Sequence, residues 1–77
     1  MTERKYFWNQ DSDYLYEFQE LTGRYPNEWN AVVYRPYEEP YKMTLSEQDL
    51  CESHKPIEKQ EFMRKRIKSC LRLRQCY

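Results

Sequence analysis

The residues of this chain best suited to chemistry are one histidine and three cysteines. Cys51 and His54 stand three residues apart and are followed by Cys70 and Cys76, in the pattern C-x2-H…C-x5-C. Four such ligands would suit tetrahedral zinc. The spacing opposes a zinc site, because a continuous helix from Pro56 would carry Cys70 about 21 Å along its axis, at ~1.5 Å per residue. We therefore predict no metal and no cofactor.

The cysteines also indicate a cellular setting. An odd number of them argues against a closed set of disulfides, and the first residues show no secretory signal. We expect free thiols in a reducing, cytoplasmic environment. Cys51 and Cys70 are then interpreted as small core residues, and Cys76, near the chain end, as exposed.

Catalysis has little support in the pattern of residues. Cys51 and His54 would touch on one helical turn, but a reactive thiolate also needs a positive or polar pocket. The chain holds a single glycine, Gly23, and neither a glycine-rich phosphate loop nor a G-x-S-x-G motif. Neighbouring carboxylates such as Glu38 and Glu39 are commoner as solvated surface than as acid–base pairs. We predict that the protein is not an enzyme, and we keep a thiol or metal site at Cys51 and His54 only as a third hypothesis.

The charges of the chain are divided along its length. All 13 acidic residues lie at or before Glu61, whereas residues 62–77 carry six basic residues and no acidic one. The zero net charge therefore combines −6 for residues 1–61, which hold seven basic residues, with +6 for residues 62–77. A basic helix of this kind can bind phosphates, bind an acidic protein surface, or pair with acidic residues of its own chain. The predicted contacts to nucleic acid or to an acidic partner are Arg64, Lys65, Lys68 and Arg72.

Aromatic residues are the other unusual feature, at 17% of the chain. Two prolines stiffen the stretch from Tyr34 to Tyr41, and tyrosine offers a large contact area at a low entropic cost. These rings either contact a partner or fill a core that is short of aliphatic residues. The predicted partner-binding residues are Tyr34, Tyr37, Glu38, Glu39 and Tyr41.

The elements that must position these residues begin with a predicted helix over residues 11–23. Its apolar residues recur at i, i+1, i+4 and i+7, and Gly23 is the predicted left-handed cap at its end. Residues 29–35, which contain Val-Val-Tyr, predict a strand, and residues 41–45 are its predicted returning strand in a loose β-hairpin. The alternative for this part of the chain is a short helix that starts at Pro26.

Two further helices are predicted in the second half of the chain. Thr44 and Glu47 match a capping box, with Ser46 as a competing cap, and predict a helix to about His54. Pro56 then opens another helix, because proline is tolerated in the first turn. The expected buried face of the last helix is Met63, Ile67, Cys70 and Leu71, opposite Lys65, Lys68 and Arg72.

Together these patterns predict one small α+β domain, residues 1–77, in the order helix, β-hairpin and two C-terminal helices. Residues 62–77 are its basic C-terminal helix, and an all-α fold is the alternative. No apolar run is long enough to span a membrane.

We expect a cytoplasmic, non-enzymatic protein that binds another protein as an adaptor or inhibitor. Its size and composition resemble those of small accessory proteins of phages and mobile elements, and the divided charge suggests a nucleic-acid-handling host enzyme as the target. The alternative is a regulator that binds DNA or RNA through the basic helix. Self-association would add burial that a domain of this size lacks.

Overall fold

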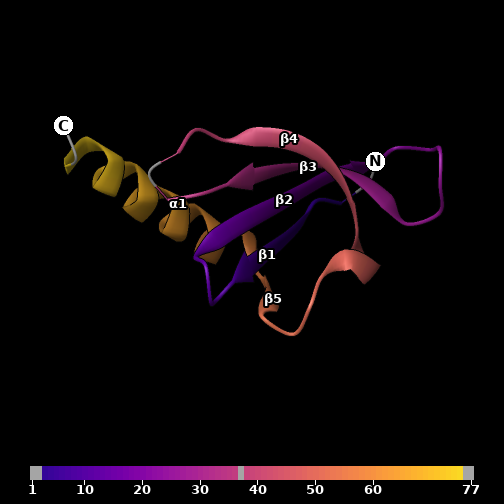
Figure 1. The fold of residues 1–77 in the computed structure, drawn as a ribbon, viewed down its shortest axis with the longest axis horizontal. Helices are drawn as coiled ribbons and strands as arrows, with labels where there is room; N and C mark the ends of the chain where they lie inside the picture. The colour runs from indigo at the N-terminus through magenta and orange to yellow at the C-terminus, as the bar shows by residue number, and fades with distance from the viewer. Residues whose placement is uncertain (1–2, 37, 76–77) are drawn as a thin grey trace.

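Five strands and one α-helix make up the computed structural model, which describes residues 3–36 and 38–75, with side chains up to residue 67. Its elements are drawn in Figure 1. They are β1 (Lys5–Asn9), β2 (Tyr14–Leu21), β3 (Glu28–Tyr34), β4 (Tyr41–Ser46), the 3-10 helix η1 (Glu47–Asp49), β5 (His54–Ile57) and α1 (Lys59–Gln75).

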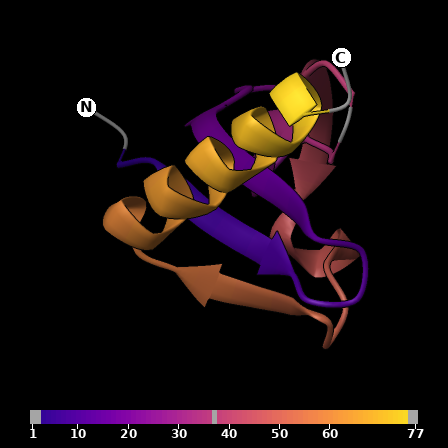
Figure 2. The ribbon, with the colours of Figure 1, turned by 90° about the vertical axis from the view of Figure 1, so that its left-hand side faces the viewer.

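The strands form a single antiparallel sheet in the order β4-β3-β2-β1-β5. The chain runs through β1 to β4 as successive hairpins. The connection that contains η1 then returns from β4 at one edge to β5 at the other. α1 follows β5 and lies across one face of the sheet (Figure 2). Because strand side chains alternate between the two faces, each face has its own core.

The core under α1 is built on aromatic rings. Phe62 is 1% exposed, and its ring centroid lies 4.7 Å from that of Tyr6 and 5.6 Å from that of Tyr34. Glu17, opposite Tyr6 in register, is also buried here. Its carboxylate pairs with the Arg4 guanidinium at 3.6 Å, as a buried charge requires.

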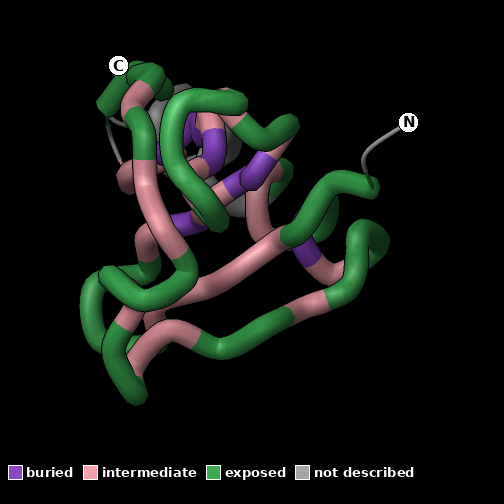
Figure 3. Tube along the Cα trace, turned by 90° about the vertical axis from the view of Figure 1, so that its right-hand side faces the viewer, coloured by how far each residue is buried: buried purple, intermediate pink, exposed green. Residues whose placement is uncertain are grey.

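The core on the opposite face is covered by the connection between β4 and β5. Phe18, Trp29 and Ala31 form its buried cluster, and Leu50 of the connection packs against them. The other side chains packed on this cluster are Phe7, Tyr16 and Leu45. Buried residues thus concentrate in the central strands β2 and β3 and in the first turn of α1, while the edges stay more exposed (Figure 3).

The helix predicted over residues 11–23 is wrong, because most of this segment is strand β2. Leu15 and Glu17 point to the face under α1, and Tyr16 and Phe18 point to the opposite face. Both faces of the sheet are covered, so apolar residues occupy both and the alternation typical of a half-buried strand is lost. The remaining spacing of apolar residues then fits a helical period as well.

Gly23 lies in the turn between β2 and β3, and one part of its prediction, the left-handed conformation, is confirmed. This residue has a φ of 81°, which is the predicted left-handed conformation, but it lies in a hairpin turn and not at a helix end.

The predicted hairpin is confirmed: β3 and β4 pair from Val33 opposite Tyr41 to Glu28 opposite Ser46. The alternative helix from Pro26 is therefore wrong.

The helix predicted over residues 44–54 is also wrong, since only the three residues of η1 are helical there. A capping box is present, but Ser46 is the cap. The Asp49 carboxylate accepts from the Ser46 backbone N–H at 3.0 Å. Pro56 opens no helix and lies in the edge strand β5, where proline is tolerated. The described chain thus has one C-terminal helix where two were predicted.

Candidate functional site

The side of α1 that faces the sheet carries cations as well as Phe62. The Lys65 ammonium lies 3.7 Å from the centre of the Trp8 ring, and the Arg66 guanidinium carbon lies 4.2 Å from the centre of the Tyr34 ring. A cation over an aromatic face is attracted by the quadrupole of the ring, so these two side chains hold α1 on the sheet. Lys65 is half-buried, and its predicted position on the solvent side is wrong.

The opposite side of α1 is exposed and partly apolar. We name Gln60, Met63, Arg64 and Ile67 the outer face of α1. Met63 is 47% exposed and Ile67 is 58% exposed, which overturns their predicted burial. The physical reason is that the sheet surface under α1 consists of aromatic rings. Phe62, Lys65 and Arg66 pack on these rings, so the aliphatic side chains of Met63 and Ile67 are left on the solvent side. A shallow hollow on this face is lined by Lys59, Gln60, Met63 and Arg64.

The rest of the predicted helix residues have no described side chains. They lie in α1 as backbone only, so their predicted faces and contacts fall outside the described residues. These residues are Lys68, Cys70, Leu71 and Arg72. Arg64 is the one residue of the predicted basic set that the described structure places on the exposed side of α1.

The predicted tyrosine site is divided by the fold. Tyr34 is half-buried against Phe62 and Arg66, and burial raises its pKa, with a further rise from the carboxylate of Glu17. This ring serves the core. Tyr41, by contrast, is 38% exposed, with the Arg35 guanidinium 4.5 Å from its ring centre.

The acidic part of the same site lies in the loop between β3 and β4. Glu38 pairs with Arg35, at 2.8 Å between Oε2 and Nε, and Glu39 is exposed. Tyr37 lies outside the described residues. The structure therefore brings Arg35, Glu38 and Tyr41 together, while Tyr34 turns toward α1.

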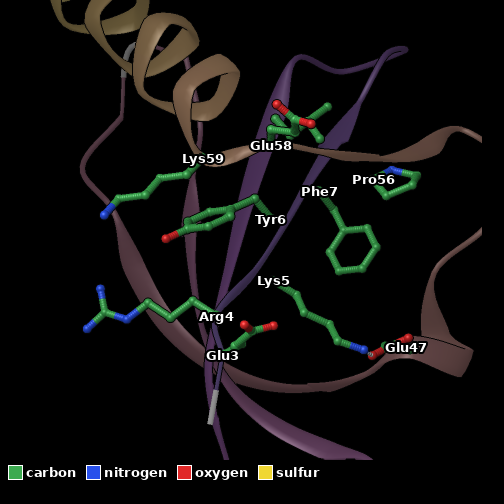
Figure 4. Close-up of a pocket in the computed structure, with 10 residues that line it drawn as sticks. Glu3, Arg4, Lys5, Tyr6, Phe7, Glu47, Pro56, Glu58 and Lys59 are labelled. Atoms are coloured by element: carbon green, nitrogen blue, oxygen red, sulfur yellow. Dashed lines mark hydrogen bonds and ion pairs between the residues drawn. The ribbon is translucent and has the colours of Figure 1, made fainter. Parts of the chain in front are cut away.

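A hollow of the described surface lies where β1 begins and β5 ends (Figure 4). Lys5 Nζ reaches Glu47 Oε1 at 2.6 Å across it, and the Arg4 and Lys59 side chains lie on either side of the Tyr6 ring. Charges of both signs line this hollow, and its central pair is already satisfied. It therefore shows no preference for a ligand of either charge. Among the described residues, no group of three or more metal-ligating side chains occurs.

Cys51 and His54 meet in the turn that leads into β5. The His54 backbone N–H donates to the Cys51 carbonyl at 3.0 Å, and the Cys51 N–H donates to His54 Nδ1 at 3.1 Å. The Cys51 Sγ lies 3.3 Å from the same nitrogen. The sequence predicted this contact on a helical turn, and the structure makes it in a tight turn. Cys51 is exposed, so its predicted place in the core is wrong.

Asn9 also contacts His54, and nothing in the sequence around Asn9 predicts this contact, because the two residues are 45 positions apart. Antiparallel pairing of β1 with β5 puts Asn9 opposite His54, and the Asn9 amide nitrogen lies 3.3 Å from His54 Nε2. The Asn9 amide oxygen accepts from the backbone N–H groups of Asp11 at 2.9 Å and Ser12 at 3.2 Å. Those two bonds hold the amide nitrogen toward the imidazole. The Tyr16 ring meets the other side of His54 edge-on, at 5.0 Å between centroids.

Comparisons with known proteins name no relative. No protein-family model matches the chain, and no curated protein and no solved structure matches it. In the described part of the chain, no helix has the length and apolar character needed to cross a membrane.

Proposed function

We propose that this chain is a non-enzymatic protein-binding protein, an adaptor or inhibitor, that docks through the outer face of α1. The observation that carries the proposal is the exposure of Met63 and Ile67, four residues apart on the same helix. Two apolar side chains at this spacing form a short stripe, which is the pattern by which an amphipathic helix binds in the groove of a partner.

The fold of the chain leaves this stripe free. Phe62, Lys65 and Arg66 already fill the contact between α1 and the sheet, so Met63 and Ile67 are not needed for the core. α1 also extends past the end of the sheet (Figure 1), where a partner can approach it from more than one side. Apolar side chains that are kept exposed together in this way are typical of interaction sites.

The charge of the helix selects the chemistry of the partner. Residues 62–77 carry six basic residues and no acidic one, and Arg64 lies beside the exposed apolar pair. An apolar groove with acidic residues at its rim would bury Met63 and Ile67 and complement the surrounding cations. We therefore assign an acidic protein groove as the occupant of this face, in the cytoplasm, where free thiols are maintained.

Nucleic acid is the alternative partner, and the geometry favours it less. Phosphate binding draws on cations that point outward, whereas Lys65 and Arg66 are half-buried over aromatic rings. Exposed methionine and isoleucine side chains add nothing to the binding of phosphates. Nucleic acid is therefore treated as an outcome of the test.

The test is a pull-down with three forms of the tagged protein: wild type, Met63→Glu and Leu21→Glu. Met63 and Leu21 are both 47% exposed, so the two substitutions make the same chemical change at equal exposure, on α1 and at the end of β2. Each capture is made from untreated lysate and repeated after nuclease treatment, and bound protein and nucleic acid are both quantified. Supporting results are a protein captured at near-equal stoichiometry by wild type and Leu21→Glu but lost with Met63→Glu, and a cross-link from it to α1.

Two outcomes would overturn the proposal. Equal capture by all three forms would show that the partner binds another surface. Nucleic acid as the main retained species, lost at raised salt, would assign the basic residues of α1 to phosphate binding.

A further inference from the structure

We propose that the chain forms a symmetric dimer in which β4 pairs antiparallel with β4 of a second copy. This contact is independent of the outer face of α1. β4 is one edge of the sheet (Figure 1), and an edge strand presents backbone groups that can pair with another strand. The opposite edge, β5, has four residues and includes Pro56, which has no N–H to donate. The sheet therefore has one edge open to pairing.

The contacts of Glu28 show which backbone groups of β4 point away from the sheet. The Glu28 carbonyl accepts from the Thr22 N–H at 2.9 Å, and its N–H donates to the Tyr25 carbonyl at 3.3 Å. Both groups are thus used on the β2 side of β3. Ser46, which is opposite Glu28, therefore points its own groups outward, and its N–H is bonded to the Asp49 carboxylate.

Two further residues of β4 share this outward orientation. Inward and outward groups alternate along an antiparallel strand, and β3 pairs with β4 without a bulge. Lys42 and Thr44 therefore point their N–H and C=O groups outward, as Ser46 does. Both residues are exposed, and no segment of the described chain pairs with this side of β4. Their backbone groups are open to a partner strand.

These open groups fit a second copy in one register. A twofold axis at Met43 places Lys42 opposite Thr44 of the second copy, and the two residues can exchange both hydrogen bonds. The same exchange occurs on the other side of the axis. An axis at Thr44 would instead pair Lys42 with Ser46, whose N–H is already bonded. An axis at Lys42 would place two ammonium groups side by side. The axis at Met43 alone satisfies all the open groups.

The apolar side chains of β4 suit the same register. Met43 and Leu45 are opposite Ala31 and Trp29 of the core on the face away from α1, and Tyr41 shares this face. In the dimer, Met43 meets its own copy and Tyr41 meets Leu45 of the second chain. Tyr41 is 38% exposed, and Met43 and Leu45 are half-buried. The contact thus buries apolar surface through cross-strand pairs, which stabilise a sheet.

The charge of β4 also permits this contact. Lysine protects many edge strands from pairing, because like charges directly opposite each other repel. The axis at Met43 places Lys42 opposite the hydroxyl of Thr44, so no like charges face each other along β4. Both copies use the same surface, and such a contact closes at two chains. The proline in β5 keeps the joined sheet from growing at its outer edges.

Sedimentation equilibrium of the full chain over a range of concentrations measures the association. We expect the average mass of the wild type to approach twice the 9.7 kDa of one chain. Thr44→Pro removes an outward N–H and leaves the bonds between β3 and β4 in place, so it should abolish the dimer. Thr44→Val is the matched control, because it keeps the N–H, and it should dimerise like the wild type.

A charge exchange tests the register. Thr44→Lys places a lysine opposite Lys42 of the second copy, twice in each dimer, and should raise the dissociation constant roughly 2–30-fold. Adding Lys42→Glu to Thr44→Lys sets opposite charges at the same two places and should restore the dimer. An unfolding transition like that of the wild type confirms that each variant folds. If Thr44→Pro does not fold, the charge exchange decides.

Several results would overturn the proposal. A wild type that stays monomeric at about 1 mM lacks the contact. A folded Thr44→Pro that dimerises like the wild type would place the contact on another surface. A double variant that dimerises no better than Thr44→Lys would exclude the register. Loss of the dimer in Met63→Glu would assign it to the outer face of α1.

Discussion

The ammonium of Lys65 lies 3.7 Å from the centre of the Trp8 ring and joins α1 to the first strand of the sheet. Lys65 Nζ is also 3.9 Å from Glu61, one turn earlier. The ring occupies the position that an aliphatic side chain would fill in a conventional helix–sheet contact. A basic residue of the helix is thus part of its attachment to the sheet, and the apolar residues Met63 and Ile67 stay exposed.

This contact predicts a measurable coupling between the two side chains. In a double-mutant cycle of Lys65→Met and Trp8→Leu, we expect a coupling free energy of roughly 0.5–1 kcal/mol at this partly exposed site. Urea unfolding of the four proteins measures it. The cycle of Arg64→Met with Trp8→Leu is the control, since Arg64 lies on the outer face of α1. Equal couplings in the two cycles would show that the Trp8 ring does not bind Lys65.

The division of α1 into an inner and an outer face predicts unequal effects of two adjacent truncations. Phe62 is 1% exposed, whereas Met63 is 47% exposed. We expect Phe62→Ala to lower the free energy of unfolding by about 3–5 kcal/mol, through the cavity left beside Tyr6 and Tyr34. Met63→Ala should change it by no more than about 0.5 kcal/mol, as at other surface positions. Chemical denaturation of both variants tests the assignment, and a larger loss for Met63→Ala would reverse the two faces.

Two tyrosines make the stability of the fold sensitive to alkaline pH. Burial raises the pKa of Tyr16 and of Tyr34 above their ordinary value of 10.0. A raised folded-state pKa contributes stability that is present below the unfolded pKa and lost as pH rises through the folded pKa. The free energy of unfolding should therefore fall as pH rises above about 10.

Phenylalanine at both positions removes the two titrating phenols. We expect the protein with Tyr16→Phe and Tyr34→Phe to lose less stability than wild type over the same alkaline range. Unfolding in urea at a series of pH values measures the difference, and phenolate absorbance follows the titration directly. Parallel stability profiles for the two proteins would contradict this prediction.

The turn between β2 and β3 predicts a specific preference at Gly23. Its φ of 81° is left-handed, and no atom lies within 4 Å of the place where a Cβ would stand. Alanine therefore meets backbone strain and no collision, and we expect Gly23→Ala to cost roughly 1–2 kcal/mol. Gly23→Asn should cost less, because asparagine adopts this conformation more readily. Thermal or chemical unfolding compares the two, and an alanine variant as stable as wild type would rule out the strain.

Local chemistry along the chain determined several features by itself. The β-branched and aromatic residues within 29–35 indicated the hairpin, the only glycine marked a left-handed turn, and the helix predicted from residue 62 onward lies in α1 as far as Gln75, where the described residues end. The closeness of Cys51 and His54 also followed from their spacing. Each of these depends on neighbours in sequence, and backbone preferences act over that range.

The tertiary structure decided what local spacing left ambiguous. Residues 14–21 fit a helical period, yet they form a central strand because α1 and the β4–β5 connection cover both of its faces. The rings of Trp8 and Tyr34 decided which side of α1 faces the sheet, because they bind the cations of Lys65 and Arg66. Met63 and Ile67 are therefore exposed. Asn9 reached His54 only because β1 pairs with β5 at the edge of the sheet. Contacts between distant segments set all three outcomes, since the free energy of burial and of ring–cation contact depends on which surfaces meet.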